Sequence, residues 1–385
     1  MLCLRLREFE YMRIIGLYGV VGWSVDDNWL HSAGASLWID GKHYTTISEE
    51  RLSSRIKYNG NYPEQSIQYC LEEINLTKND VDIVGYVQSV HSPLRLQSIE
   101  SILKREFPNA EIKFVDHHIA HASAAFLSSP FEVASILTFD GAGNSFPIVN
   151  QQGQVVASEY ETGFFGKGNK KVEEPVMAIK HFRNGIHQKV EMNLGQIYNN
   201  LSRYIYTQIE PKKAASIDSQ FIFMESAPGK IMGLAAYGDP SKVELSCLFK
   251  IECNGYFPTI VDHCIPSDKQ LSNYAPEDIA AWLQEQFEDI LVEYVENLAY
   301  YGLTEANLVL AGGCALNVLA NRKILDSSVF DDVFVFPASN DAGLCFGAAI
   351  NLAYKNESDI ELPDNLASLG RSYSSEEIKE VLTSK

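Results

Sequence analysis

Residues 111–140 read EIKFVDHHIAHASAAFLSSPFEVASILTFD, and this stretch decides the predicted fold. A short strand, EIKFVD, leads directly into a helix that starts near Asp116, and a second buried strand, ASILTFD, follows the helix. The elements before this stretch and the elements after it come in the same order. The stretch is therefore the place where one structural unit ends and a second copy begins.

The first run of elements begins at residues 13–20, RIIGLYGV, which we expect to form a buried strand. Two more strands follow, joined by Asp40-Gly41, a pair that tolerates the positive φ of a tight turn. A helix, a strand, a second helix and the strand EIKFVD complete this run.

The second run begins at Ala134 with three expected strands, ASILTFD, SFPIVN and QVVASEYE, the last two joined by a Gln-Gln-Gly turn. It continues with helices around 194–206 and 276–300, the strand NLVLAGG, a helix over 315–325 and the strand DVFVFP. The helix over 276–300 has the strongest pattern, with a proline in its first turn and apolar residues along one face.

Two copies of this order predict a two-lobed α/β protein with the duplicated, ribonuclease H-like core of the actin/hexokinase/Hsp70 class. The first lobe covers residues 13–133 and the second covers 134–355, with an insertion at 162–190 that is either a recognition segment or a mobile loop. We expect 356–385 to be a linker and the start of a further domain, and we assign no role to residues 1–11. A generic mixed α/β sheet is the alternative fold. The cleft of this class usually holds a nucleotide, but that analogy alone proves no reaction.

The composition narrows the classes of function. The 385 residues include 31 Lys and Arg against 50 Asp and Glu, a net charge of −19, which opposes binding to nucleic acid and to anionic membranes. Seven cysteines without a CxxC pair indicate a reduced, cytoplasmic protein. No apolar run approaches the roughly 20 residues of a membrane-spanning helix.

The segment from Asp116 to Ala122 is the sharpest motif. His117 and His121 lie four residues apart on the expected helix, so both imidazoles project from one face and can bind one metal ion. A zinc-protease HExxH motif is excluded because His118 occupies the position of its glutamate. Core or capping histidines are the alternative, but the carboxyl end of a strand is where sites gather in α/β proteins.

Glycine-rich turns follow several expected strands. Such turns let backbone amides approach a phosphate, and an acid at the end of a strand can bind a metal. Each turn alone is more often structural, but together with the two histidines they predict a cleft for a metal and a phosphate. The candidate residues in these turns are Asp140, Gly141, Gly143, Gly312, Gly313, Asn317, Asp341 and Gly343.

Two further segments carry cations suited to an anionic ligand. Lys230 lies in GKIMGLAAYGDP, where the interleaved glycines suggest a backbone packed closely on a ligand, although the segment is not a Walker A loop. Arg55 and Lys57 follow an expected strand, and a solvated charge run is an equally good interpretation of them.

Taken together, the chain resembles the O-carbamoyltransferase family of nodulation and antibiotic-tailoring enzymes. The matching segments follow the family order from about residue 13 to 354. They are DHHIAHASAAFLSSPF, LTFDGAGN, GKIMGLAAYG, GGCALNVLANRKI and FPASNDAGLCFGAA, with looser matches in HSAGASLWIDGKHYTTISEERL and KYNGNYP.

The resemblance implies that His117, His121, Asp140 and Asp341 hold one metal ion, iron in the family. Imidazole with carboxylate suits iron, zinc or manganese, so the residues alone leave the metal open. The implied reaction joins the carbamoyl group of carbamoyl phosphate to AMP, using ATP, and then passes it to a hydroxyl of a small-molecule acceptor. In that scheme the metal polarises the carbamoyl carbonyl or holds a phosphate oxygen.

The resemblance also implies roles for the remaining candidates. Gly312, Gly313 and Asn317 would cradle the nucleotide, while Lys230, Arg55 and Lys57 would contact anions. His31 stands at the position of the family's His-Asp pair and would take the proton of the acceptor hydroxyl.

The chain departs from the family in three ways. Ser32 follows His31 where the family has aspartate, and Asn144 ends the DGAGN turn where the family has a second aspartate. Family members also continue into a YrdC-like domain that makes the carbamoyl-adenylate, so we expect a separate YrdC-like partner. Two alternative functions stand beside this one. The first is a threonylcarbamoyl-type tRNA modification transferase, which the net charge disfavours, and the second is a non-catalytic nucleotide- or metal-binding regulatory protein.

Overall fold

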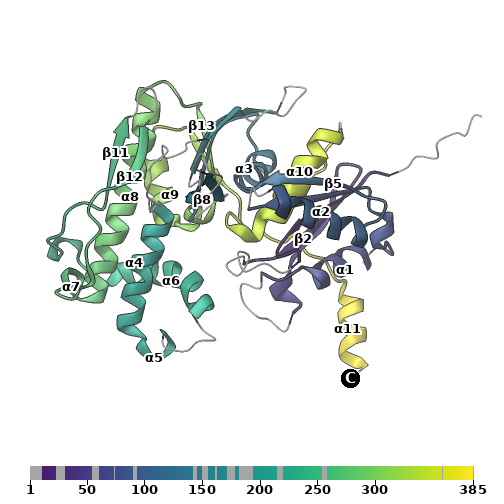
Figure 1. Cartoon of the computed structure of the whole chain (residues 1–385), viewed down its shortest axis with the longest axis horizontal. Coiled ribbons are helices and arrows are strands. Elements are labelled where there is room, and N and C mark those ends of the chain that lie inside the picture. The colour runs from purple at the N-terminus through teal and green to yellow at the C-terminus, as the bar shows by residue number, and fades with distance from the viewer. Residues whose placement is uncertain are drawn as a thin grey trace, which may run out of the picture.

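The computed structural model describes residues 11–22, 31–53, 60–72, 74–89, 93–141, 145–149, 155–160, 163–170, 178–181, 194–214, 220–253, 258–357 and 359–384. Figure 1 shows two α/β lobes, with helices α3 and α10 between them. Each lobe is built on a five-stranded sheet.

The first sheet has the strand order β3-β2-β1-β4-β5. Strands β1, β2 and β3 are antiparallel neighbours, whereas β4 and β5 run parallel to β1. The predicted turn between β2 and β3 is confirmed, with φ of 48° at Asp40 and 73° at Gly41. The elements are β1 (Arg13–Tyr18), β2 (Gly34–Ile39), β3 (Lys42–Ser48), α1 (Glu64–Glu72), β4 (Ile83–Gln88), α2 (Pro93–Glu106) and β5 (Glu111–Asp116).

The second sheet repeats this arrangement in the order β10-β9-β6-β13-β14. Three antiparallel strands are again followed by two strands parallel to the central one. The predicted fold is therefore confirmed as the duplicated, two-lobed α/β architecture of the actin/hexokinase/Hsp70 class. Its strands are β6 (Val133–Phe139), β9 (Gly163–Asn169), β10 (Ala178–His181), β13 (Asn307–Ala311) and β14 (Asp332–Val335).

The prediction of which strands follow β6 in this sheet was wrong. SFPIVN and QVVASEYE do form strands β7 (Ser145–Val149) and β8 (Val155–Tyr160), but these pair with each other in a separate two-stranded sheet. β6 pairs instead with β9, which lies in the predicted insertion at 162–190. The glycines of GFFGKGN hid this strand, because glycine is unfavourable within strands. One of them is required, since a Cβ on Gly168 would come within 2.4 Å of the Phe126 ring.

The remaining helices lie mostly in the second lobe. The predicted helix over 276–300 is confirmed as α8, which begins with Pro276 and has acidic residues in its first turn. The helix predicted over 315–325 begins at Val318, after a 3-10 turn over Gly313–Leu316. The other elements are α4 (Leu194–Ile209), α5 (Pro211–Ala214), α6 (Gln220–Leu234), β11 (Phe249–Cys253), β12 (Pro258–Asp262), α7 (Asp268–Leu271), α8 (Pro276–Tyr300) and α9 (Val318–Asp326).

Helices α3 (His117–Ser128) and α10 (Leu344–Asn356) join the two lobes. α3 follows the first sheet but also packs on β6 and β13 of the second, whereas α10 follows the second sheet and packs on β1, β2 and β4 of the first. The two helices touch closely, because a Cβ on Gly347 would come within 2.0 Å of the Ala120 carbonyl oxygen. This crossing brings the beginnings of both helices to the junction of the two lobes (Figure 1).

The C-terminal segment returns to the first lobe. The backbone N–H of Thr46 donates to the carbonyl of Leu369, and Lys42 and Glu361 form an isolated parallel β-bridge. The segment therefore runs along the edge strand β3. The final helix, α11 (Ser375–Thr383), has no buried residue.

In the described part of the chain, none of the helices combines the length and the apolar character needed to cross a membrane.

Candidate metal centre

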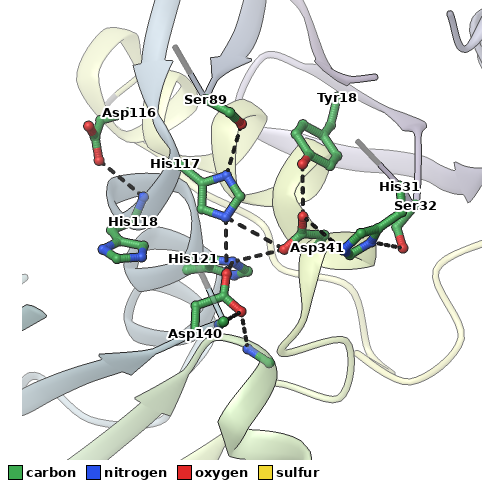
Figure 2. A network of polar contacts seen from close by, with 12 residues as sticks. Tyr18, His31, Ser32, Ser89, Asp116, His117, His118, His121, Asp140 and Asp341 are labelled. Atoms are coloured by element: carbon green, nitrogen blue, oxygen red, sulfur yellow. Dashed lines mark hydrogen bonds and ion pairs between the residues drawn. The ribbon is translucent and has the colours of Figure 1, made fainter. Parts of the chain in front are cut away.

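Four buried side chains converge at the junction of the lobes. His117 and His121 lie on α3, Asp140 follows β6 directly, and Asp341 begins the short turn (Asp341–Gly343) that leads into α10. One ligand atom from each of the four residues lies within 4.8 Å of the other three. The structure therefore brings together all four residues of the predicted metal site (Figure 2).

The distances between these atoms match the ligand shell of a single ion. The Nε2 atoms of His117 and His121 lie 3.2 and 3.3 Å from Oδ2 of Asp140. The same two atoms lie 3.5 and 3.4 Å from Oδ1 of Asp341. Ligands bound at about 2.1 Å in tetrahedral directions would be about 3.4 Å apart. The four residues thus fit a divalent metal, and their mixed donors suit iron, zinc or manganese.

The start of α3 fixes the orientation of the two histidines. The Asp116 side chain caps the helix by accepting hydrogen bonds from the backbone N–H groups of His118 and Ile119. His117 is the first helical residue and His121 lies one turn later, so the two rings face the same point. Figure 2 shows that His118 points away from the centre.

Asp140 is oriented by backbone amides. Its Oδ1 accepts hydrogen bonds from the N–H groups of Gly141 (2.8 Å) and Gly313 (3.0 Å), so that Oδ2 faces the two histidines. Gly312 makes this approach feasible, since its φ is 86° and a Cβ there would come within 2.0 Å of the Phe139 carbonyl oxygen. The diglycine turn therefore holds a carboxylate of the metal centre.

The amides predicted to cradle a nucleotide phosphate have partners inside the protein. The N–H groups of Gly141 and Gly313 donate to Asp140, that of Gly312 donates to the carbonyl of Ser339, and that of Gly343 donates to the carbonyl of Asn340. The role of these glycines toward a cofactor stays a prediction. Gly143 lies outside the described residues.

Asn317 lies in a second buried cluster of polar side chains, which we call the Gln284 network: Tyr198, Gln284, Glu288 and Asn317. The side-chain oxygen of Asn317, Oδ1, caps α9 by accepting from the Ala320 N–H, and it also accepts from Gln284 Nε2 at 2.9 Å. The Asn317 amide donates to Gln284 Oε1 at 3.0 Å, and Tyr198 Oη donates to the same oxygen at 2.8 Å. Gln284 Nε2 also donates to Glu288. The side chain of Asn317 is thus engaged within the protein, and its predicted role toward a nucleotide stays untested.

Three residues of the first lobe surround the centre. Tyr18, the last residue of β1, donates its hydroxyl to Oδ2 of Asp341 at 2.8 Å. Ser89 Oγ lies 3.2 Å from Nδ1 of His117, and His31 Nε2 lies 3.8 Å from Oδ2 of Asp341. The predicted base is therefore next to the metal centre (Figure 2).

Tyr18 and Ser89 were missed by the sequence reasoning. Tyr18 ends the central strand of the first sheet, and Asp140 follows the central strand of the second. A polar residue at the end of the central strand of each repeat is the signal that could have pointed to Tyr18. No equivalent signal marks Ser89, because a lone serine at the end of a strand is common.

The electrostatics favour protons or a cation between the four side chains. Burial lowers the pKa of His117, but attraction by Asp341 and hydrogen bonds with both carboxylates outweigh burial and raise this pKa to about 10. The same balance raises the pKa of His121. Burial also raises the pKa of Asp140 and Asp341, yet their contacts with the histidines hold both values below the usual range. Metal binding must therefore displace protons from the imidazoles.

Tyr18 is different, because burial and the neighbouring Asp341 carboxylate both raise its pKa. Its hydroxyl therefore stays protonated and acts as a hydrogen-bond donor to Asp341.

Of the three predicted anion-binding cations, Lys230 is the one that lies in the described part of the chain, and its role toward an anion stays a prediction. Lys230 is exposed on α6, where Nζ donates to Tyr206 Oη at 2.8 Å and lies 4.4 Å from the centroid of that ring. A Cβ on Gly229 or Gly233 would meet no protein atom within 4 Å, and the predicted packing of these glycines on a ligand stays a prediction. Arg55 and Lys57 lie outside the described residues.

The duplicated fold and the four-residue centre define a two-lobed, actin-like α/β protein with a junction suited to a metal. A family profile described as "Carbamoyltransferase N-terminus" matches residues 85–350, well over half of the chain and every one of the four residues. The chain belongs to this carbamoyltransferase family, as the sequence resemblance predicted.

Curated relatives agree with this assignment. Nodulation protein NolNO of Sinorhizobium fredii is 28% identical over 361 residues, which cover 85% of this chain and 47% of the relative. An uncharacterised protein of Synechocystis sp. is 27% identical over 415 residues, which cover 91% of this chain and 61% of the relative. The chain thus spans about half of the length of the curated relatives that it matches.

Solved structures with a related arrangement share little sequence. Component A of the (R)-2-hydroxyglutaryl-CoA dehydratase of Acidaminococcus fermentans aligns with a TM-score of 0.44 and 14% identity, over 89% of this chain and 98% of that one. Full-length HypF, in a phosphate- and nucleotide-bound form, aligns with a TM-score of 0.43 and 14% identity, over 91% of this chain and 56% of that one. The fold assignment rests on the strand order of the two sheets.

Proposed function

We propose that this chain is a metal-dependent O-carbamoyltransferase that passes a carbamoyl group to a hydroxyl of a small-molecule acceptor. The observation that carries the proposal is the convergence of His117, His121, Asp140 and Asp341 in a member of the carbamoyltransferase family. Bound to these residues, a divalent metal such as iron would supply Lewis acidity toward a carbonyl or phosphoryl oxygen. The proposed location is cytoplasmic, in keeping with the cysteine content.

His31 is the proposed base. Its Nδ1 lies 3.0 Å from Ser32 Oγ, and with the proton on Nδ1 this contact leaves Nε2 to accept a proton. The imidazole side chain is 20% exposed, so it borders both the buried centre and the solvent from which an acceptor arrives. Asp341, 3.8 Å from Nε2, would stabilise the imidazolium that forms.

The proposed transfer step moves the carbamoyl group from AMP to the acceptor oxygen. The acceptor oxygen attacks the carbamoyl carbon of carbamoyl-adenylate, and the bond from that carbon to the AMP phosphate oxygen breaks. AMP leaves with the electron pair of that bond, and the hydroxyl proton passes to Nε2 of His31. Because His31 has a serine neighbour instead of aspartate, Ser32 takes over the orientation of the ring.

The donor is proposed to come from a separate protein. Carbamoyl-adenylate forms from carbamoyl phosphate, ATP and water with release of phosphate and pyrophosphate, and a YrdC-like partner would make it and deliver it to this chain.

The test combines the purified chain, loaded with Fe²⁺, with carbamoyl phosphate, ATP, a YrdC-like partner and a panel of hydroxylated small molecules. We expect carbamoylated acceptor only when ATP and the partner are present. His31→Gln should slow the transfer by about 10²–10⁴-fold, because a general base is lost. His43→Gln is the matched control, since His43 is a partly buried histidine of β3 in the first lobe that bonds to Thr46 and not to the centre.

Three results would contradict the proposal. The first is the absence of any ATP-dependent carbamoylated product from folded, metal-loaded protein across the panel. The second is modification of tRNA in place of small hydroxyl compounds, which would favour a threonylcarbamoyl-type transferase. The third is tight nucleotide binding without transfer, which would favour a regulatory protein.

A further inference from the structure

We propose that Tyr18 is a positioning residue of the metal centre, which holds Asp341 so that one defined carboxylate oxygen faces the metal. Its hydroxyl donates a 2.8 Å hydrogen bond to Oδ2 of Asp341, and both residues are buried. The other oxygen, Oδ1, is the one that lies 3.5 and 3.4 Å from the two histidine Nε2 atoms. The inference rests on the proposal that the four residues bind a metal.

A carboxylate needs such an anchor because its terminal torsion is soft and two-fold. Asp140 has one, since two backbone N–H groups hold its Oδ1 and turn Oδ2 to the centre. At Asp341 the corresponding bond comes from Tyr18. His31 Nε2 lies 3.8 Å from the same oxygen, beyond hydrogen-bond distance, and does not provide an equivalent anchor.

The place of Tyr18 in the fold supports this role. It ends β1, the central strand of the first sheet, and Asp140 directly follows β6, the central strand of the second sheet. The carboxyl ends of the two central strands thus contribute one proposed ligand and one group that orients a ligand. The ring of Tyr18 also packs edge-on against His117, with the centroids 6.0 Å apart.

The Tyr18 contact also connects the two lobes. Tyr18 belongs to the first sheet, whereas Asp341 follows the last strand of the second sheet. Groups that orient metal ligands in this way change metal affinity about 10- to 100-fold when removed. Through this contact, the metal affinity of the centre depends on how the first lobe is positioned against the second.

The experiment compares Tyr18→Phe with Tyr86→Phe. The control is closely matched, because Tyr86 is a buried tyrosine of the neighbouring strand β4 whose hydroxyl donates a 2.8 Å hydrogen bond to the carbonyl of Gly19. Each variant loses one hydroxyl oxygen that takes part in a buried hydrogen bond. The affinity for Zn²⁺ is measured by competition with a chelator, and the visible spectrum of the Co²⁺-loaded protein reports the ligand geometry.

We expect Tyr18→Phe to bind Zn²⁺ about 10- to 100-fold more weakly, with altered Co²⁺ bands. The Zn²⁺ affinity of Tyr86→Phe should stay within about threefold of that of the wild type, and its Co²⁺ spectrum should be unchanged, because the Tyr86 hydroxyl bonds to Gly19 and not to a ligand. Equal affinity of Tyr18→Phe and wild type would overturn the positioning role, and so would equal losses in both variants. A wild-type protein that binds no Zn²⁺, Co²⁺ or Fe²⁺ would instead defeat the metal proposal itself.

Discussion

The metal centre and the Gln284 network are both buried clusters of polar side chains in this protein, but they satisfy their polar atoms in opposite ways. In the Gln284 network, donors meet acceptors, as where the Asn317 amide donates to Gln284 and Gln284 donates to Glu288. At the metal centre, two carboxylates and two imidazoles turn their atoms toward one shared point.

The difference shows how a ligand site is distinguished from a structural network. Placing Asp140 and Asp341 together in a buried space is unfavourable unless positive charge lies between them. In the Gln284 network the polar atoms are satisfied within the protein by hydrogen bonds and by the ion pair of Glu288 with Lys323, which stabilises the fold. The first arrangement is therefore suited to protons or a bound cation between its carboxylates, and the second to a structural role.

The largest expected effect is on a ligand itself. His121→Ala should weaken Zn²⁺ binding by more than about 100-fold, since losing a ligand costs more than losing a group that orients one. His118→Ala is the matched control, because His118 is a buried histidine on the same helix that points away from the centre. Chelator competition on both variants makes the measurement. Similar losses of affinity in the two would contradict the assignment of the ligands.

The second effect is a pH dependence. The pKa of His117 is about 10 in the metal-free protein, so its proton must leave before a metal binds. Zn²⁺ affinity should therefore rise at least about tenfold per unit between pH 6 and 8. A titration series over this range checks the slope, and an affinity independent of pH would contradict the protonated state of the centre.

The same proton affects folding with a defined sign. Because the pKa of His117 is raised from 6.5 to about 10, its stabilising contribution is fully present below 6.5 and is lost as the pH rises toward 10. The metal-free protein should therefore melt at a lower temperature at pH 9 than at pH 7, relative to a His117→Gln variant. If the melting temperature of the wild type relative to that of His117→Gln increased as the pH rises, the predicted sign would be contradicted.

The smallest expected effect on metal binding comes from the Gln284 network. Asn317→Ala removes the cap of α9 and both hydrogen bonds between Asn317 and Gln284, which should lower the free energy of unfolding by about 2–3 kcal/mol. Zn²⁺ affinity should stay within about twofold of the wild type. Urea unfolding together with chelator competition separates the two quantities, and a large loss of metal affinity would show that the two clusters are coupled.

Much of the fold could be predicted because the chain repeats itself. Buried strands, the Asp40-Gly41 turn and the periodic helix α8 all depend on local patterns that the sequence displays directly. The choice between β7 and β9 as the partner of β6 depends on contacts between distant segments. The segments of β7 and β8 were predicted to follow β6 in its sheet. The strand that pairs with β6 is instead the glycine-bearing β9, whose Gly168 lies against Phe126.

The site could be predicted in the same uneven way. The spacing of His117 and His121 and the acids at strand ends are local, and they led to the four residues that the structure brings together. Tyr18 carries no motif, and its role appears only when β1 and α10 are placed side by side. The predicted contact of the diglycine turn with a phosphate stays a prediction. The hydrogen bond from the Gly313 N–H to Asp140 could not be predicted, because the close approach of the turn to β6 is a tertiary feature.

The central claim is that one metal ion binds among His117, His121, Asp140 and Asp341, and anomalous diffraction from crystals of the metal-loaded protein tests it most directly. With data collected at the absorption edge of the metal, we predict one strong peak at bonding distance from Nε2 of both histidines and from one oxygen of each aspartate. A map with no peak among these four atoms, or with the strongest peak elsewhere, would contradict the claim.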